Sequence, residues 1–240
     1  MLATSFYAIL RYYQFTAAAL GSGFPRDALL AFGIASLLLA SLYVFGQQDI
    51  KRLLAYSSIE HMGILAIGVG FGAPVALAGV MLHVLAHAAA KGNAFMGAGV
   101  FVVKYGTKQI ATIRGALDVL PWSGPLFLLA IFALSALPPS GIFRSEFQIV
   151  AGGHYAAAAV LVVLVTVVFF GLTGASTRIL LTPAPRSLSA AAAIGRGEPS
   201  AWMVVPAVAG IVVLFILGLH PPGELTSLIS RAVIQLGAVR

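Results

Sequence analysis

This 240-residue sequence contains no cysteine, and only 9% of its residues are charged. The lack of cysteine excludes a disulfide framework and any zinc or iron–sulfur site held by thiolates. Soluble domains carry about 25% charged residues. Low charge combined with 60% hydrophobic residues and a mean hydropathy of +1.01 excludes a soluble globular protein. The composition is that of a membrane protein.

The apolar segments are continuous and do not alternate with polar residues, which excludes a transmembrane β-barrel. A spanning helix needs about 20 apolar residues, and six or seven such helices fit this length. We predict an all-α integral membrane protein with about seven transmembrane helices in a single domain over residues 1–220. Residues 221–240 form a tail that is too polar to span, and we expect it at the membrane interface. The predicted spans cover residues 1–10, 28–46, 53–72, 74–103, 119–147, 155–177 and 201–219.

Two of these spans are irregular. The first is interrupted at Arg11 and looks like a helix whose beginning is short or missing. In the fifth, Pro138-Pro139 removes backbone donors and clashes with the preceding turn, so we predict a broken helix that resumes at Gly141. Irregular backbone at membrane depth is tolerated where protein or a wet cavity surrounds it.

The basic residues fall unequally on the two sides of this topology. The net charge of +7 comes from fourteen basic residues, which we interpret as topology signals and not as a nucleic-acid surface. The larger group places its side in the cytoplasm, so the N-terminus is predicted in the cytoplasm and the C-terminus outside. That group is Lys51, Arg52, Lys104, Lys108, Arg114, Arg178, Arg186 and Arg196, and the smaller group is Arg11, Arg26, Arg231 and Arg240.

A few ionisable residues lie inside the apolar spans. Placing a charge at mid-membrane costs about 2.5–3.5 kcal/mol on insertion scales, so such groups normally face the bundle interior or a hydrated path. We therefore treat them as the candidate functional residues. They are Glu60, His61, His83, His87, Lys91, Arg144 and Glu146.

Three of them form a column on one helix. His83, His87 and Lys91 are spaced four residues apart, and four residues turn a helix by about 400°, so the three side chains follow one face over about 12 Å. Imidazole can receive a proton on one nitrogen and release it from the other. The spacing therefore predicts a proton relay. In the alternative structural interpretation, the histidines bond backbone carbonyls and Lys91 extends to the cytoplasmic end.

The other candidates follow the Pro-Pro break or precede the column. Arg144 and Glu146 point in different directions on a helix, so we predict Glu146 as a protonatable stop whose proton affinity Arg144 adjusts. Alternatively, both cap the break. Glu60 and His61 are adjacent and cannot share a face: one belongs to the polar axis, and the other could bond a neighbouring helix. For this pair, functional and structural interpretations are equally supported.

Cofactor motifs are missing from the sequence. His83 and His87 have no third ligand at metal-binding spacing on the same helix, so no metal site is predicted. Neither a phosphate-binding glycine loop nor a haem or cluster ligation pattern occurs. We therefore predict no cofactor in this chain.

Three ordered motifs resemble a known family. Residues 49–63, Asp-Ile-Lys-Arg-Leu-Leu-Ala-Tyr-Ser-Ser-Ile-Glu-His-Met-Gly, resemble a junction in the antiporter-like membrane subunits of respiratory complex I, Mrp-type cation/proton antiporters and energy-converting nickel–iron hydrogenases. The His83, His87 and Lys91 column is similar to that family's relay helix. Residues 137–147 look like its broken-helix motif. The exact sequences of residues 58–63 and 141–147 favour the hydrogenase-4 and formate hydrogenlyase branch of this family.

The resemblance implies a fold and roles for residues. The family has fourteen helices in two inverted repeats, and this chain resembles helices 8–14. By resemblance, Lys91 is the central lysine, His83 and His87 are its relay partners, and Glu146 is the terminal carboxylate. Ala3 stands where several relatives place a lysine or histidine. Since the first repeat is absent, we expect either another subunit to supply that half or a shortened relative with a partial role.

These features together predict a proton-translocating membrane subunit of a redox-driven, quinone-linked complex in the inner (cytoplasmic) membrane. The expected partners are other membrane subunits, including one that supplies the N-terminal helices, together with a hydrophilic redox arm and the lipid bilayer. No nucleic-acid partner is expected. Because the sequence shows no electron carrier, the chain would not itself catalyse the redox reaction. An Mrp-type antiporter component and a non-conducting scaffold are the alternatives.

Overall fold

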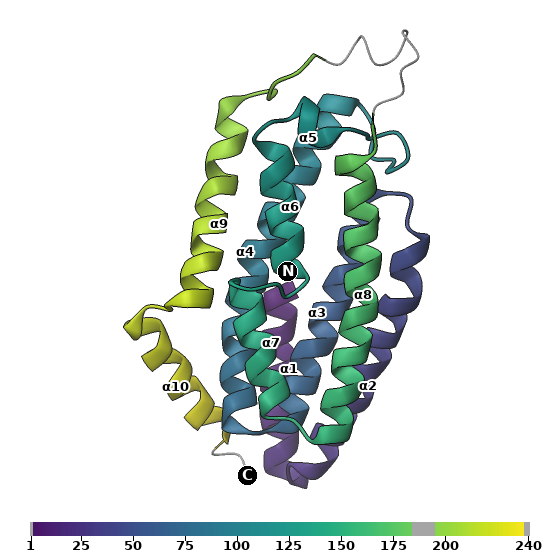
Figure 1. The fold of residues 1–240 in the computed structure, drawn as a ribbon. Helices are drawn as coiled ribbons and strands as arrows, with labels where there is room; N and C mark the ends of the chain where they lie inside the picture. Colours follow the sequence, from purple (N-terminus) through teal and green to yellow (C-terminus); the bar gives the residue numbers. More distant parts are fainter. Residues whose placement is uncertain (1, 184–194, 238–240) are drawn as a thin grey trace.

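The computed structural model describes residues 2–183 and 195–237, a helical bundle without strands over that part of the chain (Figure 1). Met1, Arg186 and Arg240, used in the predictions above, lie outside the described residues. The helices are α1 (Leu2–Leu20), α2 (Gly23–Tyr43), η1 (Val44–Gly46), α3 (Ile50–Phe71), α4 (Pro74–Tyr105), α5 (Ala116–Val119), α6 (Ser123–Leu134), α7 (Gly141–Ala151), α8 (Tyr155–Leu181), η3 (Ala201–Met203), α9 (Val204–Leu219) and α10 (Gly223–Gly237).

Within residues 2–183 and 195–237, five helical stretches are long and apolar enough to cross a membrane, namely α2 with η1, α3, α4, α8, and η3 with α9. The shorter apolar helix α6 continues beyond the break as α7, and together they run beside α8 along its length (Figure 1). The predicted all-α, multi-pass membrane protein is thus confirmed. Helix α1 and the broken α6–α7 pair are not among these five, so the predicted number of about seven spans stays a prediction.

The first helix differs from the prediction. The expected interruption at Arg11 is absent, and α1 runs unbroken for 19 residues. The Arg11 side chain is exposed and donates a hydrogen bond to Gln14 on the same helix, at 3.2 Å. The helix therefore continues through Arg11, whose guanidinium bonds within the same helix. Helix α1 begins at mid-height in the bundle (Figure 1).

The central hairpin of α3 and α4 is fixed by its caps. Asp49 caps α3 by accepting hydrogen bonds from the backbone N–H groups of Lys51 and Arg52. Gly72, at φ 66°, ends α3 in the left-handed conformation that glycine tolerates. Pro74 then starts α4, where its missing N–H costs no helical hydrogen bond.

Asp49 is also tied to the loop after α4. Its carboxylate lies 2.9 Å from the Lys108 ammonium. Burial by itself would raise the pKa of Asp49, but the hydrogen bonds from Lys108 and from the Lys51 and Arg52 N–H groups outweigh it and lower the pKa below its usual value. The start of α3 and the loop after α4 are therefore linked at one end of the bundle.

Most of the basic residues assigned to the cytoplasmic side do lie at that same end. The start of α3, the end of α4, its following loop and the end of α8 all meet at the top of Figure 1. They carry Lys51, Arg52, Lys104, Lys108, Arg114 and Arg178. At the opposite end, the Arg26 guanidinium packs against Gly72.

Glycines bring the helices of the interior into close contact. A Cβ atom added to Gly79 of α4 would lie 2.7 Å from the backbone oxygen of Ser145 in α7. Small residues at helix interfaces let backbones approach in this way. The hydroxyl of Ser140 caps α7 by accepting from the Phe143 N–H, at 3.2 Å. Helix α7 thus begins directly after the break and packs closely against α4.

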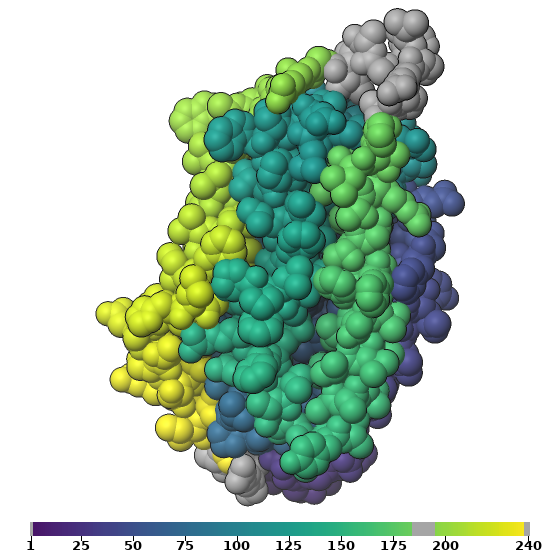
Figure 2. All heavy atoms as spheres, viewed as in Figure 1, coloured from purple at the N-terminus to yellow at the C-terminus, as the bar shows by residue number. Residues whose placement is uncertain are grey.

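The polar tail forms α10, which lies obliquely beside the lower half of α4 (Figure 1). Its Leu236 is buried, and Leu228 and Ile229 line a pocket with side chains of α1 and α4. An interfacial position for this helix stays a prediction. On the face shown in Figure 2, α8 and α9 flank the shorter α6 and α7.

Candidate functional site

Six of the seven ionisable residues singled out above are buried between α3, α4 and α7. None is more than 7% exposed. Helix α3 contributes two, α4 contributes three, and α7 contributes one. They are Glu60 and His61; His83, His87 and Lys91; and Glu146.

His61 completes the column that the sequence placed on α4 alone. Its Nδ1 lies 3.1 Å from Nε2 of His83. The ring centroids of His61 and His87 are 4.7 Å apart, whereas those of His83 and His87 are 6.3 Å apart. The neighbouring helix therefore supplies the link between the two histidines of α4.

Glu146 lies on the other side of His61. Its Oε1 is 3.9 Å from His61 Nδ1 and has no hydrogen-bond partner within the described residues. The same residue lines a cavity of about 320 Å³ formed mainly by α7, α8 and the segment before the break. A proton reaching Glu146 would thus stand at the border of the cluster.

Lys91 is held inside the bundle. Its ammonium donates hydrogen bonds to the Leu54 carbonyl at 2.9 Å and to the Ser57 hydroxyl at 2.5 Å, both on α3. No carboxylate lies within 4.0 Å of it in residues 2–183 and 195–237. Glu60 interacts with it electrostatically. Lys91 is 6% exposed, so its charge can respond to nearby charges with little screening by water.

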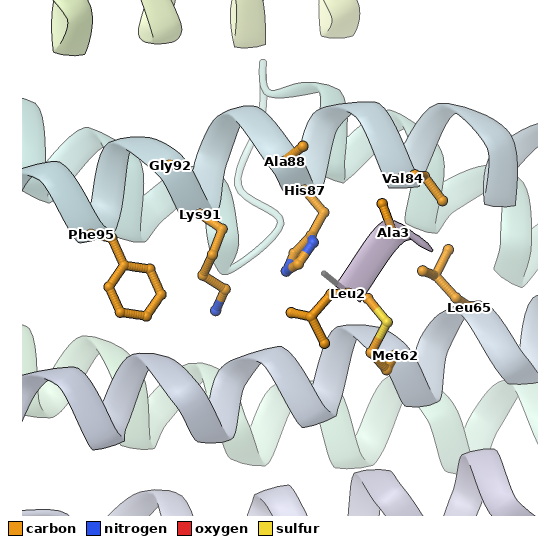
Figure 3. Close-up of a pocket in the computed structure, with 10 residues that line it drawn as sticks. All are labelled: Leu2, Ala3, Met62, Leu65, Val84, His87, Ala88, Lys91, Gly92 and Phe95. Atoms are coloured by element: carbon orange, nitrogen blue, oxygen red, sulfur yellow. The ribbon is translucent and has the colours of Figure 1, made fainter. Parts of the chain in front are cut away.

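A second cavity of about 320 Å³ adjoins the Lys91 end of the column. Figure 3 shows His87 and Lys91 extending from α4 toward α3, with Leu2 and Ala3 of α1 beside them. The column therefore has a cavity at each end, one beside Lys91 and one beside Glu146.

Arg144 is the one predicted residue that the fold does not bring to the cluster. Its Nη1 donates to the backbone oxygens of Gly218 at 3.3 Å and Leu219 at 3.5 Å. These carbonyls end α9, where a cationic side chain is favourable. Arg144 thus connects α7 to the outer helix α9.

Two serines at the site were not selected from the sequence. Ser57 binds Lys91, and Ser145 lies 2.9 Å from His83 Nδ1. Serine carries no ionisable group, so a search for charges in apolar spans passes over it. Both lie inside the quoted family motifs, which was the only available signal.

The donor atoms of His61, His83 and Glu146 lie within 4.8 Å of one another. Such a set could hold a metal ion, and it comes from three helices, so spacing along one helix could not have revealed it. The hydrogen bond between the two rings occupies Nδ1 of His61 and Nε2 of His83.

These features define a multi-pass membrane protein with a buried column of protonatable side chains. The family described as NADH:quinone oxidoreductase/Mrp antiporter, transmembrane, matches residues 1–171. The chain belongs to this family. It is 31% identical to a hydrogenase-4 component F homolog of Methylacidiphilum infernorum over 92% of this chain and 45% of the relative. It is also 31% identical to NADH-quinone oxidoreductase subunit N of Desulforudis audaxviator, over 97% of this chain and 49% of the relative.

Solved structures share the fold. The Mrp complex from Dietzia sp. matches with a TM-score of 0.80 at 20% identity, over 96% of this chain and 52% of that one. Respiratory complex I from Thermus thermophilus matches with a TM-score of 0.80 at 22% identity, over 94% and 49%. The chain spans about half the length of the curated relatives it matches.

Proposed function

We propose that this chain is a proton-translocating, antiporter-like membrane subunit of a redox-driven complex of the hydrogenase-4 and complex I type. The observation that carries the proposal is the continuity of protonatable groups from α4 through α3 to α7. Lys91 lies one turn from His87. The rings of His87 and His61 are 4.7 Å apart between centroids and tilted at 50°, and His61 reaches both His83 and Glu146.

The proposed path begins at Lys91 and ends at Glu146. A change of charge nearby moves a proton from the Lys91 ammonium to His87 and on to His61, which releases it toward Glu146. Glu60 interacts electrostatically with both Lys91 and Glu146, so its charge state couples the two ends of the path. The two cavities supply places where protons can enter and leave.

The names of the relatives favour a redox-driven complex over an ion-gradient antiporter. Among the curated relatives, a hydrogenase-4 component and a quinone oxidoreductase subunit match more than nine-tenths of this chain. A relative named as a probable K⁺/H⁺ antiporter subunit matches 48% of this chain. The electrons would then be carried by a hydrophilic arm made of other subunits.

We further propose that the chain lies in the inner (cytoplasmic) membrane with its basic end in the cytoplasm. Helix α1 runs away from that end, which agrees with a cytoplasmic N-terminus and an external C-terminus (Figure 1). Other membrane subunits would pack beside it. We place helices equivalent to the relatives' first half against the cavity at Leu2, Ala3 and Lys91.

Lys91→Ala tests this function. We expect it to abolish proton translocation by the assembled complex in membrane vesicles while electron transfer by the redox arm continues. Lys104→Ala is the matched control, because Lys104 is on the same helix but donates to the Gly197 carbonyl at the basic end. Normal proton translocation by Lys91→Ala would contradict the relay.

The alternatives give different results in the same assay. A gradient-driven antiporter would exchange cations for protons in vesicles without any redox subunits or electron donor. A scaffold would keep assembly and proton translocation when Lys91, His87 and Glu146 are all replaced by neutral residues. Either result would replace the proposal made here.

A further inference from the structure

The hydrogen bonds around His83 form a chain whose direction can be worked out from the number of hydrogens. Ser145 Oγ lies 2.8 Å from the Ile142 carbonyl and 2.9 Å from His83 Nδ1. A carbonyl oxygen can only accept, and a serine hydroxyl has one hydrogen. That hydrogen therefore goes to Ile142, and Ser145 Oγ accepts a hydrogen bond from His83 Nδ1–H.

This assignment fixes both rings of the pair. A neutral imidazole with its hydrogen on Nδ1 has a bare Nε2, so His83 Nε2 accepts from His61 Nδ1–H across their 3.1 Å contact. The neutral His61 then has a bare Nε2. That atom is buried and has no partner within the described residues, and its ring is the neighbour of His87.

From this geometry we propose that His61 is the residue that passes the proton to Glu146, and that Ser145 and His83 are positioning residues that keep His61 in the tautomer able to do so. The inference rests on the proposed function and deepens it. His83 thereby leaves the conducting path that spacing along α4 predicts.

The path of the transferred proton follows from the tautomers assigned to His61 and His83. His61 takes up a proton on Nε2 from the His87 side and becomes an imidazolium, whose Nδ1–H can leave toward His83 Nε2 or Glu146 Oε1, 3.9 Å away. A proton on His83 goes no further, because Ser145 gives its only hydrogen to a backbone carbonyl. The Glu146 carboxylate can accept the proton and release it at the cavity that it lines. His61 is then neutral with its remaining hydrogen on Nε2. It returns to the resting tautomer by exchange with water, which gives a hydrogen to Nδ1 and takes the one on Nε2, and the bare Nε2 of His83 favours that form because it accepts the Nδ1–H.

Nitrogen-15 magnetic resonance of ring-labelled histidine tests the tautomers without any transport. In the full chain within its membrane complex, we expect His83 and His61 both to carry hydrogen on Nδ1. Histidine-to-glutamine variants at each position assign the signals. In Ser145→Ala, His83 should lose the preference for Nδ1–H, because no acceptor faces that nitrogen. A wild-type His83 with hydrogen on Nε2 would overturn the proposal.

Transport measurements supply the second readout. Losing one net hydrogen bond of about 1 kcal/mol corresponds to about a fivefold effect, so Ser145→Ala should lower the rate of proton translocation about fivefold. Ser176→Ala is the matched control: Ser176 is equally buried, and its hydroxyl donates to the Leu172 carbonyl of its own helix, at 2.8 Å. It should leave tautomers and rate unchanged.

The outcomes separate this inference from the proposed function. If Ser145→Ala changes neither the His83 signal nor the rate, the positioning role is wrong while the Lys91 result still decides the relay. His61→Gln should stop translocation, and His83→Gln should only slow it. An equal loss of proton translocation in both variants would show that His83 conducts protons, which would overturn its assignment as a positioning residue.

Discussion

The inner helices α3 and α4 and the outer helices α8 and α9 follow opposite rules of composition. In the most apolar 18-residue windows, 72% of the residues in α3 and 56% of those in α4 are buried in the protein, against 33% in α8 and 22% in the η3–α9 span. Yet α8 and α9 are the more hydrophobic pair, and the protonatable column lies on α3 and α4.

The difference reflects the bilayer as a solvent. Lipid tails are as apolar as leucine, so a hydrophobic helix has no reason to leave them for the interior. Glycines and polar groups do gain from the interior, where backbones pack closely and polar atoms find partners. Burial in this bundle is thus indicated by small and polar residues, and Gly63, Gly79 and Lys91 are examples.

Introducing a lysine on the outer helix α9 should have the largest effect on the protein. Val212 is 51% exposed at the middle of α9. In Val212→Lys the ammonium meets lipid without the Leu54 and Ser57 acceptors that Lys91 has, at a cost of about 2.5–3.5 kcal/mol. We expect the variant to insert poorly, as measured by membrane-fraction yield.

Val212→Leu is the control and should accumulate normally. A well-inserted Val212→Lys protein would mean that α9 faces a polar partner or cavity at this point, and the contrast between inner and outer helices would not apply there.

Adding one methyl group at the inner contact should have the next largest effect. Gly79→Ala forces α4 and α7 apart, since the new Cβ would lie 2.7 Å from the Ser145 backbone oxygen. Overpacking of this kind costs about 1–3 kcal/mol. We expect a lower unfolding temperature and slower proton translocation.

Gly99→Ala provides the comparison on the same helix, since nothing lies within 4 Å of its added Cβ. That variant should be neutral or stabilised by up to about 1 kcal/mol from helix propensity. Equal effects of the two substitutions would refute the close α4–α7 contact.

The cap of α3 should contribute less. Asp49→Ala removes a capping carboxylate and should cost about 1 kcal/mol of stability. Because the folded pKa of Asp49 is lowered from the usual 3.8, this contribution is complete above that value and is lost as the pH falls through the folded pKa. Thermal unfolding between pH 7 and pH 3 should show the two proteins converging at the acid end, and a constant difference would contradict the assignment.

The smallest effect concerns how α9 is attached to the interior. Arg144→Ala removes two long hydrogen bonds to the end of α9, worth about 0.5 kcal/mol. We expect faster amide hydrogen exchange near Gly218 and unchanged proton translocation. Arg11→Ala, which removes a bond within one exposed helix, should change neither. A loss of translocation in Arg144→Ala would restore this residue to the relay.

Much of this arrangement was predictable from local features. The all-α membrane fold, the break at Pro138-Pro139 and the column on α4 all follow from runs and spacings along the chain, and the structure has them. The error at Arg11 has a simple cause: a helix is held by its backbone hydrogen bonds and arginine is a good helix former, so a charged side chain does not by itself interrupt a helix.

Composition and motif order determined the class of protein, because a membrane selects strongly for apolar runs and makes each buried charge conspicuous. The tertiary structure alone decided that His61 joins the column, that Arg144 lies away from it, and that Ser145 contacts His83. Those contacts join residues 22 to 75 positions apart, and helical periodicity contains no information about which face of one helix meets which face of another.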